Sequence, residues 1–453
     1  MKAQYIVRTG GVKYLLLAIP VAILVIFTIN FLMIKYEDIL LLKQQIEYLG
    51  KIFINTVIVI TCIAVSINAY YTAKISRSLG SGGLAKLLLG NFINEQKGIE
   101  IEIGYQDSIS NKLILEHFNS AIEQLGNEKT ETRLGAIYSL EAIVKKAPNY
   151  HWTIMEILAA FIRENSPNGE IEVIEETDDN DNDDDEIILL SKIPTDIQAA
   201  LTIIGRRNTA FDSEKQIIEL KDTDLRCADL NQANLQKVDF SGSNLSYVMM
   251  SGANLEKADF TGGDLTGAIL YQANLKEAVL YETNLEEAIL IKANLSEAML
   301  YQANLQAAML YDANFAGAML YEANLQNAIL CDANFEGVNL EQANLFGANL
   351  IGVNLQRAVL IGANLESATL STANLVSANL YEANLHKANL IQADLKKANL
   401  TGANFKDALL QQVDLIGADL QRVENLSAEQ ITDAIGDSTT ILPDYLESPS
   451  NWE

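Results

Sequence analysis

The most regular pattern in the chain is a large apolar residue at every fifth position from Leu220 to Leu420, without insertion or deletion. The residue two positions before each of these centres is almost always Ala. Five residues of an α-helix turn through about 500°, and five residues of a flat strand put successive centres on alternate faces. All centres can point inward only if each pentapeptide forms one side of a coil. The pattern therefore predicts a solenoid.

The small residues have a physical purpose in such a coil, because bulkier side chains would overpack its thin interior. We expect the large centres and the alanines before them to form one continuous core. Representative members of that core are Leu275, Leu295, Leu305, Phe315, Leu325, Ala273 and Ala293.

A second period, of ten residues, sets the number of sides. Between about 264 and 334 the residue before the centre alternates between Asn and an apolar residue, as at Asn274, Val279, Asn284 and Ile289. Three sides would stack Asn on Ile or Met in the next coil, whereas four sides stack like on like. We therefore predict a four-sided coil in which Asn faces and apolar faces alternate, with neighbouring coils about 4.8 Å apart.

Segments such as Ala253-Asn254-Leu255-Glu256-Lys257 and Ala393-Asp394-Leu395-Lys396-Lys397 resemble the motif of the pentapeptide-repeat family. That motif is a small residue, Asp or Asn, Leu or Phe, and two variable residues. The resemblance implies a right-handed quadrilateral β-helix over residues 218–424. It implies no activity, because a fold does not set a function.

Two uncharged runs near the N-terminus, residues 14–34 and 52–73, are each long enough to span a bilayer, which needs about 20 residues. They predict a transmembrane helical hairpin within residues 1–79, with two buried core helices as the alternative. Six cations flank the hairpin and three lie in its loop, which favours a cytoplasmic soluble part. We therefore expect an integral membrane protein.

Residues 80–109 are interpreted as a linker and residues 110–210 as a small all-α module. In that module Ser110 is expected to cap a first helix that Gly126 ends, Thr130 to open a second, and Thr195 to cap the last. Its sequence is similar to the helical module that precedes the repeats in many bacterial, especially cyanobacterial, membrane pentapeptide-repeat proteins. The fold class is therefore mixed: membrane hairpin, helical module and β-helix.

Two further segments complete the chain. Residues 165–187 hold an acidic loop in which Asp179, Asp181 and Asp183 are spaced like calcium ligands, but Asp184 and Leu190 stand where a calcium loop needs Gly and Glu. A solvated loop is the better interpretation. Residues 425–453 are predicted to cap the open β-helix, with a short helix that starts from Ser427 and Gln430.

Composition excludes several functions. The formal net charge of −27 opposes binding to nucleic acid, and three distant cysteines oppose a disulfide framework. The three histidines have no metal-ligand spacing, and no nucleotide-binding or nucleophile motif occurs. We therefore predict no catalytic residue, no metal, no cofactor and no enzyme activity.

The candidate interaction surface is aromatic. On a four-sided coil, three tyrosines stack in one row beside Met299 and Met319, while other tyrosines lie on the opposite side. Tyr and Met are enriched at protein interfaces, although stacked tyrosines also favour β-ladders in themselves. The candidate residues are Tyr281, Tyr301, Tyr321, Met299, Met319, Tyr271 and Tyr311.

Three functions remain open at this point. The first is a non-enzymatic, membrane-anchored interaction or scaffold module with an unidentified protein partner, and self-association into a homo-oligomer is compatible with it. The second is a DNA-mimicking topoisomerase-binding protein, as in relatives that protect or inhibit DNA gyrase. Residues 218–424 hold 25 acidic and 12 basic residues, but apolar rows interrupt that charge. The third is an accessory subunit of a membrane transport complex, which the uncharged spans disfavour as an ion path.

Overall fold

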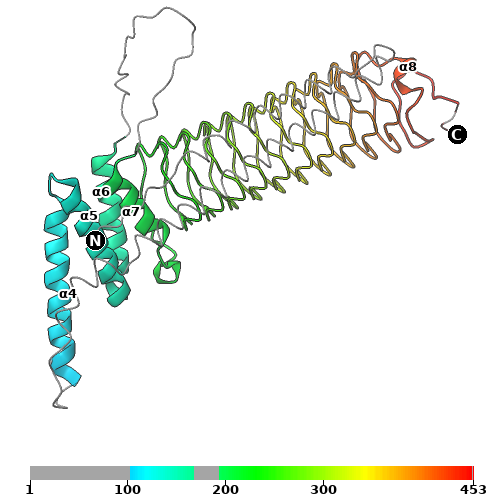
Figure 1. The fold of residues 1–453 in the computed structure, drawn as a ribbon. Coiled ribbons are helices and arrows are strands. Elements are labelled where there is room, and N and C mark those ends of the chain that lie inside the picture. The colour runs from blue at the N-terminus through cyan, green and yellow to red at the C-terminus, as the bar shows by residue number, and fades with distance from the viewer. Residues whose placement is uncertain (1–102, 168–192, 451, 453) are drawn as a thin grey trace, which may run out of the picture. The chain divides into compact units, whose positions relative to one another are not determined.

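The computed structural model describes residues 103–167, 193–450 and 452 (Figure 1). The helical part precedes the rod, and one short helix follows the rod. The helices are α4 (Ile103–Leu125), α5 (Thr130–Lys146), α6 (His151–Asn165), α7 (Thr195–Gly205) and α8 (Ala428–Ile431), with short 3-10 helices at Pro148–Tyr150 and Thr209–Phe211.

Helices α4 to α7 pack around a small apolar core. Ile137, Leu140, Ile154, Leu158 and Leu201 are fully buried in it. The side chains come from helices α5, α6 and α7, so burying them joins three helices that could not be stable separately.

One buried ion pair fastens α5 to α7. The Arg133 guanidinium contacts the Asp196 carboxylate at 2.6 Å, and Asp196 is almost fully buried. Arg133 also donates to the carbonyls of Asn127 and Glu128, which end the loop before α5. Its charge is therefore shared between the carboxylate and the loop, as a buried charge requires.

Two expected helix starts are wrong. Helix α4 begins at Ile103, before Ser110, because neither proline nor glycine interrupts the chain between Tyr105 and Leu125. Thr195 is the first helical residue of α7 and not its cap, because Pro194 occupies the capping position and offers no side-chain acceptor. The starts of α5 at Thr130 and the end of α4 before Gly126 agree with the sequence.

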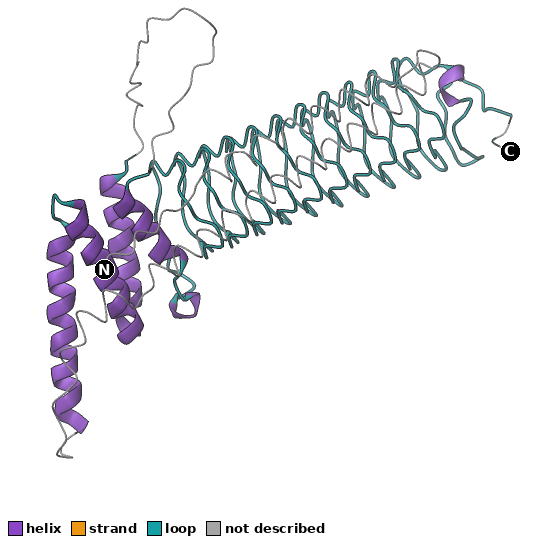
Figure 2. Ribbon diagram, viewed as in Figure 1, coloured by secondary structure: helices purple, strands orange, loops and turns teal. Residues whose placement is uncertain are grey.

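The rod is a four-sided β-helix, as predicted. Parallel bridges join residues twenty apart from coil to coil, for example Asn254 to Asn274 and Met299 to Met319. Each side contributes an isolated bridge and not an extended strand, so Figure 2 draws the whole rod as loop. The centres and their alanines fill the interior: Leu275, Leu295, Leu305, Phe315, Leu325, Ala273 and Ala293 are all 0 or 1% exposed.

The corners of the coil reveal a feature that the sequence analysis missed. The second residue after every centre has a positive φ, as at Gln302 (56°), Ala307 (55°) and Gly317 (68°). The centre's carbonyl accepts from the N–H three residues later, as Leu305 does from Ala308 at 3.1 Å, which closes a tight turn. Glycine at this position in eleven corners was the available signal.

The C-terminal end of the rod is closed by α8 and the chain after it. Ser427 and Gln430 form the predicted capping box, and the Gln430 amide also donates to the carbonyls of Phe405 and Ala408 in the last full coil. The helix ends at Ile431, so Ile435 lies beyond it and pairs with Asp414 as the next rung. Trp452 is buried and its indole donates to Ala434 at 2.9 Å.

The predicted membrane spans, 14–34 and 52–73, and the acidic run at 178–186 lie outside the described residues. Within the described ranges, no helix combines the length and apolarity that crossing a bilayer requires.

Candidate functional site

Two opposite sides of the rod are ladders of asparagine. On one of them the Asn274 amide donates to the Asn254 side-chain oxygen at 3.1 Å, and Asn294 donates to Asn274 at 3.0 Å. The same oxygen accepts from the backbone two residues on, as Asn294 does from Ser296. These side chains thus hold the corners and join the coils, and their hydrogen bonds are made within the rod.

Between the asparagine sides lies the tyrosine face, defined here as Val279, Tyr281, Met299, Tyr301, Met319 and Tyr321. Parallel bridges align Val279, Met299 and Met319 in successive coils, so the three tyrosines stand one coil apart. Ring centroids are 5.1 Å apart for Tyr281 and Tyr301 and 6.4 Å for Tyr301 and Tyr321. The structure therefore brings these predicted residues together in one continuous row.

Two of the three tyrosine hydroxyls on this face point to sulfur, whereas that of Tyr321 donates to Gln342 Oε1 at 3.3 Å. Tyr281 Oη lies 3.5 Å from Met299 Sδ, and Tyr301 Oη lies 2.7 Å from Met319 Sδ. Neighbouring rings are inclined to one another by 46° and 47°. Tyr281 and Met319 are the most exposed of the set, at 36% and 42%. A partner would meet ring and thioether surface here.

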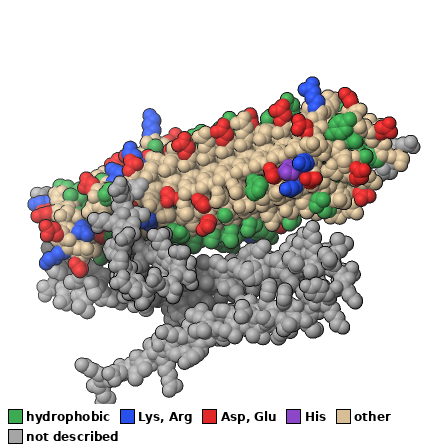
Figure 3. Space-filling view, turned by 90° about the horizontal axis from the view of Figure 1, so that it is seen from above, with side chains coloured by type: hydrophobic (Ala, Val, Ile, Leu, Met, Phe, Trp, Pro, Cys, Tyr) green, Lys and Arg blue, Asp and Glu red, His purple; other side chains and the backbone are tan. Residues whose placement is uncertain are grey.

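Both edges of the tyrosine face are acidic. The corner after the tyrosines carries the exposed carboxylates Glu282 and Glu322, and Gln302 between them donates to Glu322 at 2.7 Å. The corner before them carries Glu277 and Glu297, with Lys276 within 3.4 and 3.6 Å of the two. Lys257 also lies 3.3 Å from Glu277, so that four carboxylates against two ammonium groups leave this stretch negative. In Figure 3, hydrophobic side chains gather along one edge of the visible rod, with acidic side chains beside them.

The opposite apolar side is less continuous. Tyr271 and Tyr311 are separated by Ile291, which is 9% exposed, and no ring pair forms between them. Lys292 on its edge pairs with Asp312 at 3.7 Å. The two sides share their apolar character, but of the two only the tyrosine face presents pairs of neighbouring rings.

Two of the candidate tyrosines, Tyr321 and Tyr311, have raised pKa values. A hydrogen bond with Glu322, followed by burial, raises the pKa of Tyr321. Burial, followed by the charges of Asp332 and Asp312, raises the pKa of Tyr311. Both hydroxyls therefore stay protonated at neutral pH, and neither is suited to act as a base.

The helical part closes the N-terminal end of the rod. The first coil would otherwise expose unpaired backbone groups, as any sheet edge does. Asn234 N–H donates to the carbonyl of Gly205 at 2.7 Å, and Asp224 N–H donates to that of Ser166 at 2.8 Å. The Gln198 side chain exchanges two hydrogen bonds with the backbone of Asp229. The helices thus supply acceptors and donors in place of a preceding coil.

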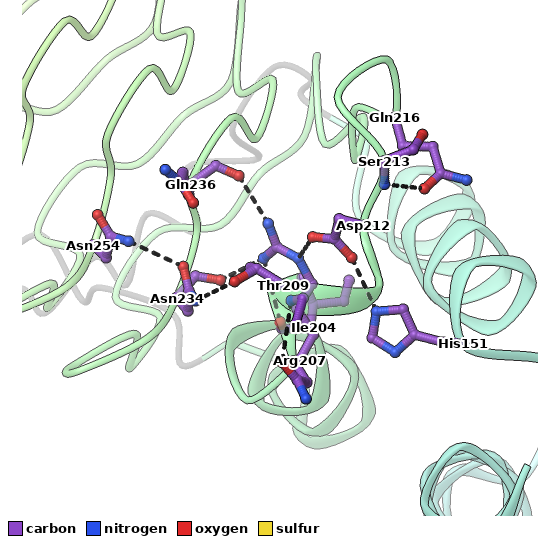
Figure 4. Close-up of polar contacts among 12 residues, drawn as sticks. His151, Ile204, Arg207, Thr209, Asp212, Ser213, Gln216, Asn234, Gln236 and Asn254 are labelled. Carbon is purple, nitrogen blue, oxygen red and sulfur yellow. Dashed lines mark hydrogen bonds and ion pairs between the residues drawn. The ribbon is translucent and has the colours of Figure 1, made fainter. Parts of the chain in front are cut away.

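Arg207 is the centre of this junction (Figure 4). Its Nε donates to the Asp212 carboxylate at 2.9 Å, and its other nitrogens donate to the carbonyls of Asn234 and Gln236 in the first coil. His151 Nε2 lies 3.0 Å from the same carboxylate. Burial lowers the pKa of Arg207, while the hydrogen bond and charge of Asp212 oppose that shift. Arg207 was expected at a helix end, and no sequence pattern predicts this contact.

The remaining polar groups do not assemble a reactive site within the described residues. His117 is exposed on α4, His151 is buried at the junction, and His386 lies between Glu366 and Asp407 at 3.3 and 3.5 Å. No group of three metal-ligating side chains occurs in the described ranges.

A cavity of about 290 Å³ lies beside Pro167, Pro194 and Arg226. It is small for a ligand pocket. The guanidinium of Arg226 is held by both oxygens of Asp224, at 2.8 and 2.6 Å. The cavity thus offers no free charge.

Comparisons with known proteins agree on the repeat. Residues between 223 and 424 match the family model described as "Pentapeptide repeats", in eight copies. No curated protein matches the chain. No catalytic family is indicated.

Several solved structures are similar. HetL, involved in heterocyst differentiation regulation in the cyanobacterium Nostoc sp. strain PCC 7120, is 32% identical over 51% of this chain and 95% of its own, with a TM-score of 0.25. Rfr23 from the cyanobacterium Cyanothece 51142 is 30% identical over 26% of this chain and 66% of its own, with a TM-score of 0.15. QnrB1, a plasmid-mediated fluoroquinolone resistance protein, is 20% identical over 43% and 89%, with a TM-score of 0.21.

Proposed function

This chain belongs to the pentapeptide-repeat family, and from that premise we propose that it is a non-enzymatic, membrane-anchored interaction module. The repeats form a right-handed β-helix, and the tyrosine face of that rod receives a protein partner. Proteins of this family are generally structural or interaction modules.

The observation that carries the proposal is the continuous row of tilted, partly exposed rings and thioethers on one side of the rod. Tyr and Met are among the residues enriched at protein interfaces, and a contiguous apolar patch on a soluble surface is usually a binding site. The asparagine sides lack this character because their amides bond within the rod.

The other parts of the chain support that role. The apolar runs at 14–34 and 52–73 would tether the module to a membrane, with the rod on the cytoplasmic side. The helices close the first coil, so that the rod cannot extend end to end.

DNA mimicry is the weaker candidate. It needs a surface that is acidic along its length, whereas two of the four sides carry rows such as Ile269, Ile289 and Met309. A transport role would rest on the membrane segments alone.

Site-specific photocrosslinking tests the proposal. A photoreactive phenylalanine replaces Tyr301 in the full-length chain, and cells are irradiated before extraction. We expect one discrete adduct with a single protein. The matched control carries the same residue at Tyr311, on the opposite side, and should give none.

A second pair of variants links the adduct to the surface. Tyr281→Lys together with Tyr321→Lys should abolish the adduct at position 301 without changing the thermal unfolding of the rod. Equal adducts at 301 and 311, or none at either position, would contradict the tyrosine face as an interface. An adduct of doubled chain mass would identify a second copy as the partner.

A further inference from the structure

One asparagine adjoins the tyrosine face at its C-terminal end. Asn339 follows Met319 in the next coil of the same side. On the asparagine sides, amide nitrogens donate to the side chain of the preceding coil, as Asn294 does to Asn274 at 3.0 Å. Met319 has no oxygen at that place. The Asn339 side-chain oxygen accepts from Glu341 N–H at 3.0 Å, but within the described residues its amide nitrogen donates to no acceptor.

The Met319 sulfur lies next to a second donor. It accepts a hydrogen bond from the Tyr301 hydroxyl at 2.7 Å, and the side chain is 42% exposed. A thioether is only a weak acceptor. Two donors, one from the coil before Met319 and one from the coil after it, therefore flank a side chain without a strong acceptor. A sulfoxide oxygen on this sulfur would supply that acceptor.

Met309, on the opposite side of the rod, is similarly accessible but has no such donors. Its side chain is 39% exposed. Its neighbours in the coils before and after it are Ile289 and Ile329, and within the described residues no hydroxyl or amide donates to its sulfur. The two methionines thus resemble each other in exposure and differ in the groups around the sulfur.

Resting on the proposed function of this face, we propose that Met319 is a site of reversible oxidation, at which hydrogen peroxide converts the thioether to a sulfoxide and thereby releases the protein partner. The Tyr301 hydroxyl and the Asn339 amide donate to the new oxygen. The oxidised side chain is polar and lies in the middle of a surface that otherwise offers rings and thioethers, so it disrupts an apolar contact.

Oxidation and its reversal are both two-electron steps. A sulfur lone pair attacks one oxygen of the peroxide, and the O–O bond breaks. The sulfur is oxidised and the peroxide is reduced, while the proton of the transferred oxygen goes to the departing hydroxide, which leaves as water. In the reverse direction a dithiol reductant becomes a disulfide, the sulfoxide oxygen leaves as water, and the thioether is restored.

Stereochemistry distinguishes this site from an ordinary exposed methionine. Oxidation makes the sulfur chiral. At Met319 the Tyr301 hydroxyl is bonded at one of the two sulfur lone pairs, so attack through the two lone pairs is not equivalent. At Met309 neither lone pair has a donor among the described residues. One sulfoxide epimer should therefore predominate at Met319 but not at Met309.

The first experiment measures that preference. The purified full-length chain is treated with hydrogen peroxide and then with either of two sulfoxide reductases, each specific for one epimer, and mass spectrometry follows each methionine. We expect an epimer ratio of at least about threefold at Met319 and near about one at Met309. Tyr301→Phe should lower the ratio at Met319 to that of Met309. Equal ratios at the two methionines in the wild type would overturn the oxygen site.

The role of Asn339 is tested without any oxidant. Met319→Gln places an amide oxygen near the position of the sulfoxide oxygen, whereas Met319→Leu keeps the side chain apolar. Asn339→Val removes the donor, and it should lower the thermal stability of the Met319→Gln chain more than that of the Met319→Leu chain. Equal losses would exclude Asn339 as a donor to this position.

The second experiment measures release of the partner. A photoreactive phenylalanine replaces Tyr281, so that Tyr301 is kept, and cells are exposed to peroxide before irradiation. Peroxide should reduce the adduct at least about fivefold. Met319→Leu should keep the adduct after peroxide, and Met319→Gln should lack it without peroxide. The matched control Met309→Leu should remain sensitive to peroxide.

The outcomes separate this inference from the proposed function. If the adduct forms but peroxide does not reduce it, or reduces it equally in Met319→Leu, the face is an interface and Met319 does not control it. If no adduct forms even before peroxide, the proposed function is wrong and so is the control of a partner by Met319. Thermal unfolding verifies that each variant is folded.

Discussion

The middle of the rod and its first coil differ in how their backbone groups are hydrogen-bonded. In the middle, every coil pairs its backbone with an identical coil, as Leu300 does with Met319, and fills its interior with the same residues. At the first coil no identical neighbour exists. Its backbone groups are bonded instead by Gly205, Gln198 and Arg207. Many equivalent coil-to-coil contacts stabilise the middle, whereas a few individual residues stabilise the N-terminal end.

The largest loss of stability should come from removing Arg207, at the N-terminal end of the rod. Arg207→Ala leaves the Asp212 carboxylate and two carbonyls without their buried donor, and should cost about 3 to 5 kcal/mol. Trp152 in α6 and Trp452 at the far end are the only tryptophans, so single-tryptophan variants report each end by fluorescence. The Trp152 transition should shift more than that of Trp452. The adjacent, exposed Arg206→Ala is the control and should shift neither.

A cavity in the middle should have the next largest effect. Leu305→Ala removes a fully buried centre and should cost about 2 to 5 kcal/mol. Gln302→Ala, on the surface of the same coil, should stay within about 0.5 kcal/mol. Chemical denaturation compares the two. Equal losses would contradict the inward placement of the centres.

The asparagine ladders should contribute less. Asn314→Ala removes the hydrogen bond to Asn294 and those accepted from Asn334 and from the Ala316 N–H at the corner, and should cost about 1 to 2 kcal/mol. Within the described residues the Asn349 side chain only accepts the corner bond from the Ile351 N–H, so Asn349→Ala should cost about 0.5 kcal/mol. The difference between the two losses of stability, followed by thermal unfolding, measures the contribution of the hydrogen bonds between coils. Identical losses would assign the whole stabilisation to the corner.

The smallest effect should be a gain. Ala307 has a φ of 55°, a conformation that costs an L-residue about 1 kcal/mol relative to glycine. Ala307→Gly should therefore stabilise the rod by up to about 0.5 kcal/mol after the added entropy of the unfolded chain. Ala308→Gly, one residue on and without a positive φ, should destabilise it by about 0.5 to 1 kcal/mol. Thermal unfolding of the two variants should thus move in opposite directions.

Much of the candidate site could be predicted from periodicity. Four sides place Tyr281 over Tyr301 as soon as twenty residues make a coil, and the bridges from Val279 to Met299 confirm that spacing. The tilt of the rings and the turn of the tyrosine hydroxyls toward methionine sulfur could not be predicted, because a repeat specifies positions and not side-chain rotamers. The role of the face stays a prediction.

The sequence by itself determined the rod: a strict period of five with small residues before the centres leaves one way to bury every Leu, and the second period of ten makes four sides the consistent choice. It also determined the C-terminal capping box, because Ser427 and Gln430 are close in sequence. Only the tertiary structure decided the junction. His151 meets Arg207 and Asp212 there from a distant segment, and the carbonyls to which Arg207 donates belong to Asn234 and Gln236. No local pattern encodes such a contact, because it depends on how helices pack against a coil that begins elsewhere in the chain.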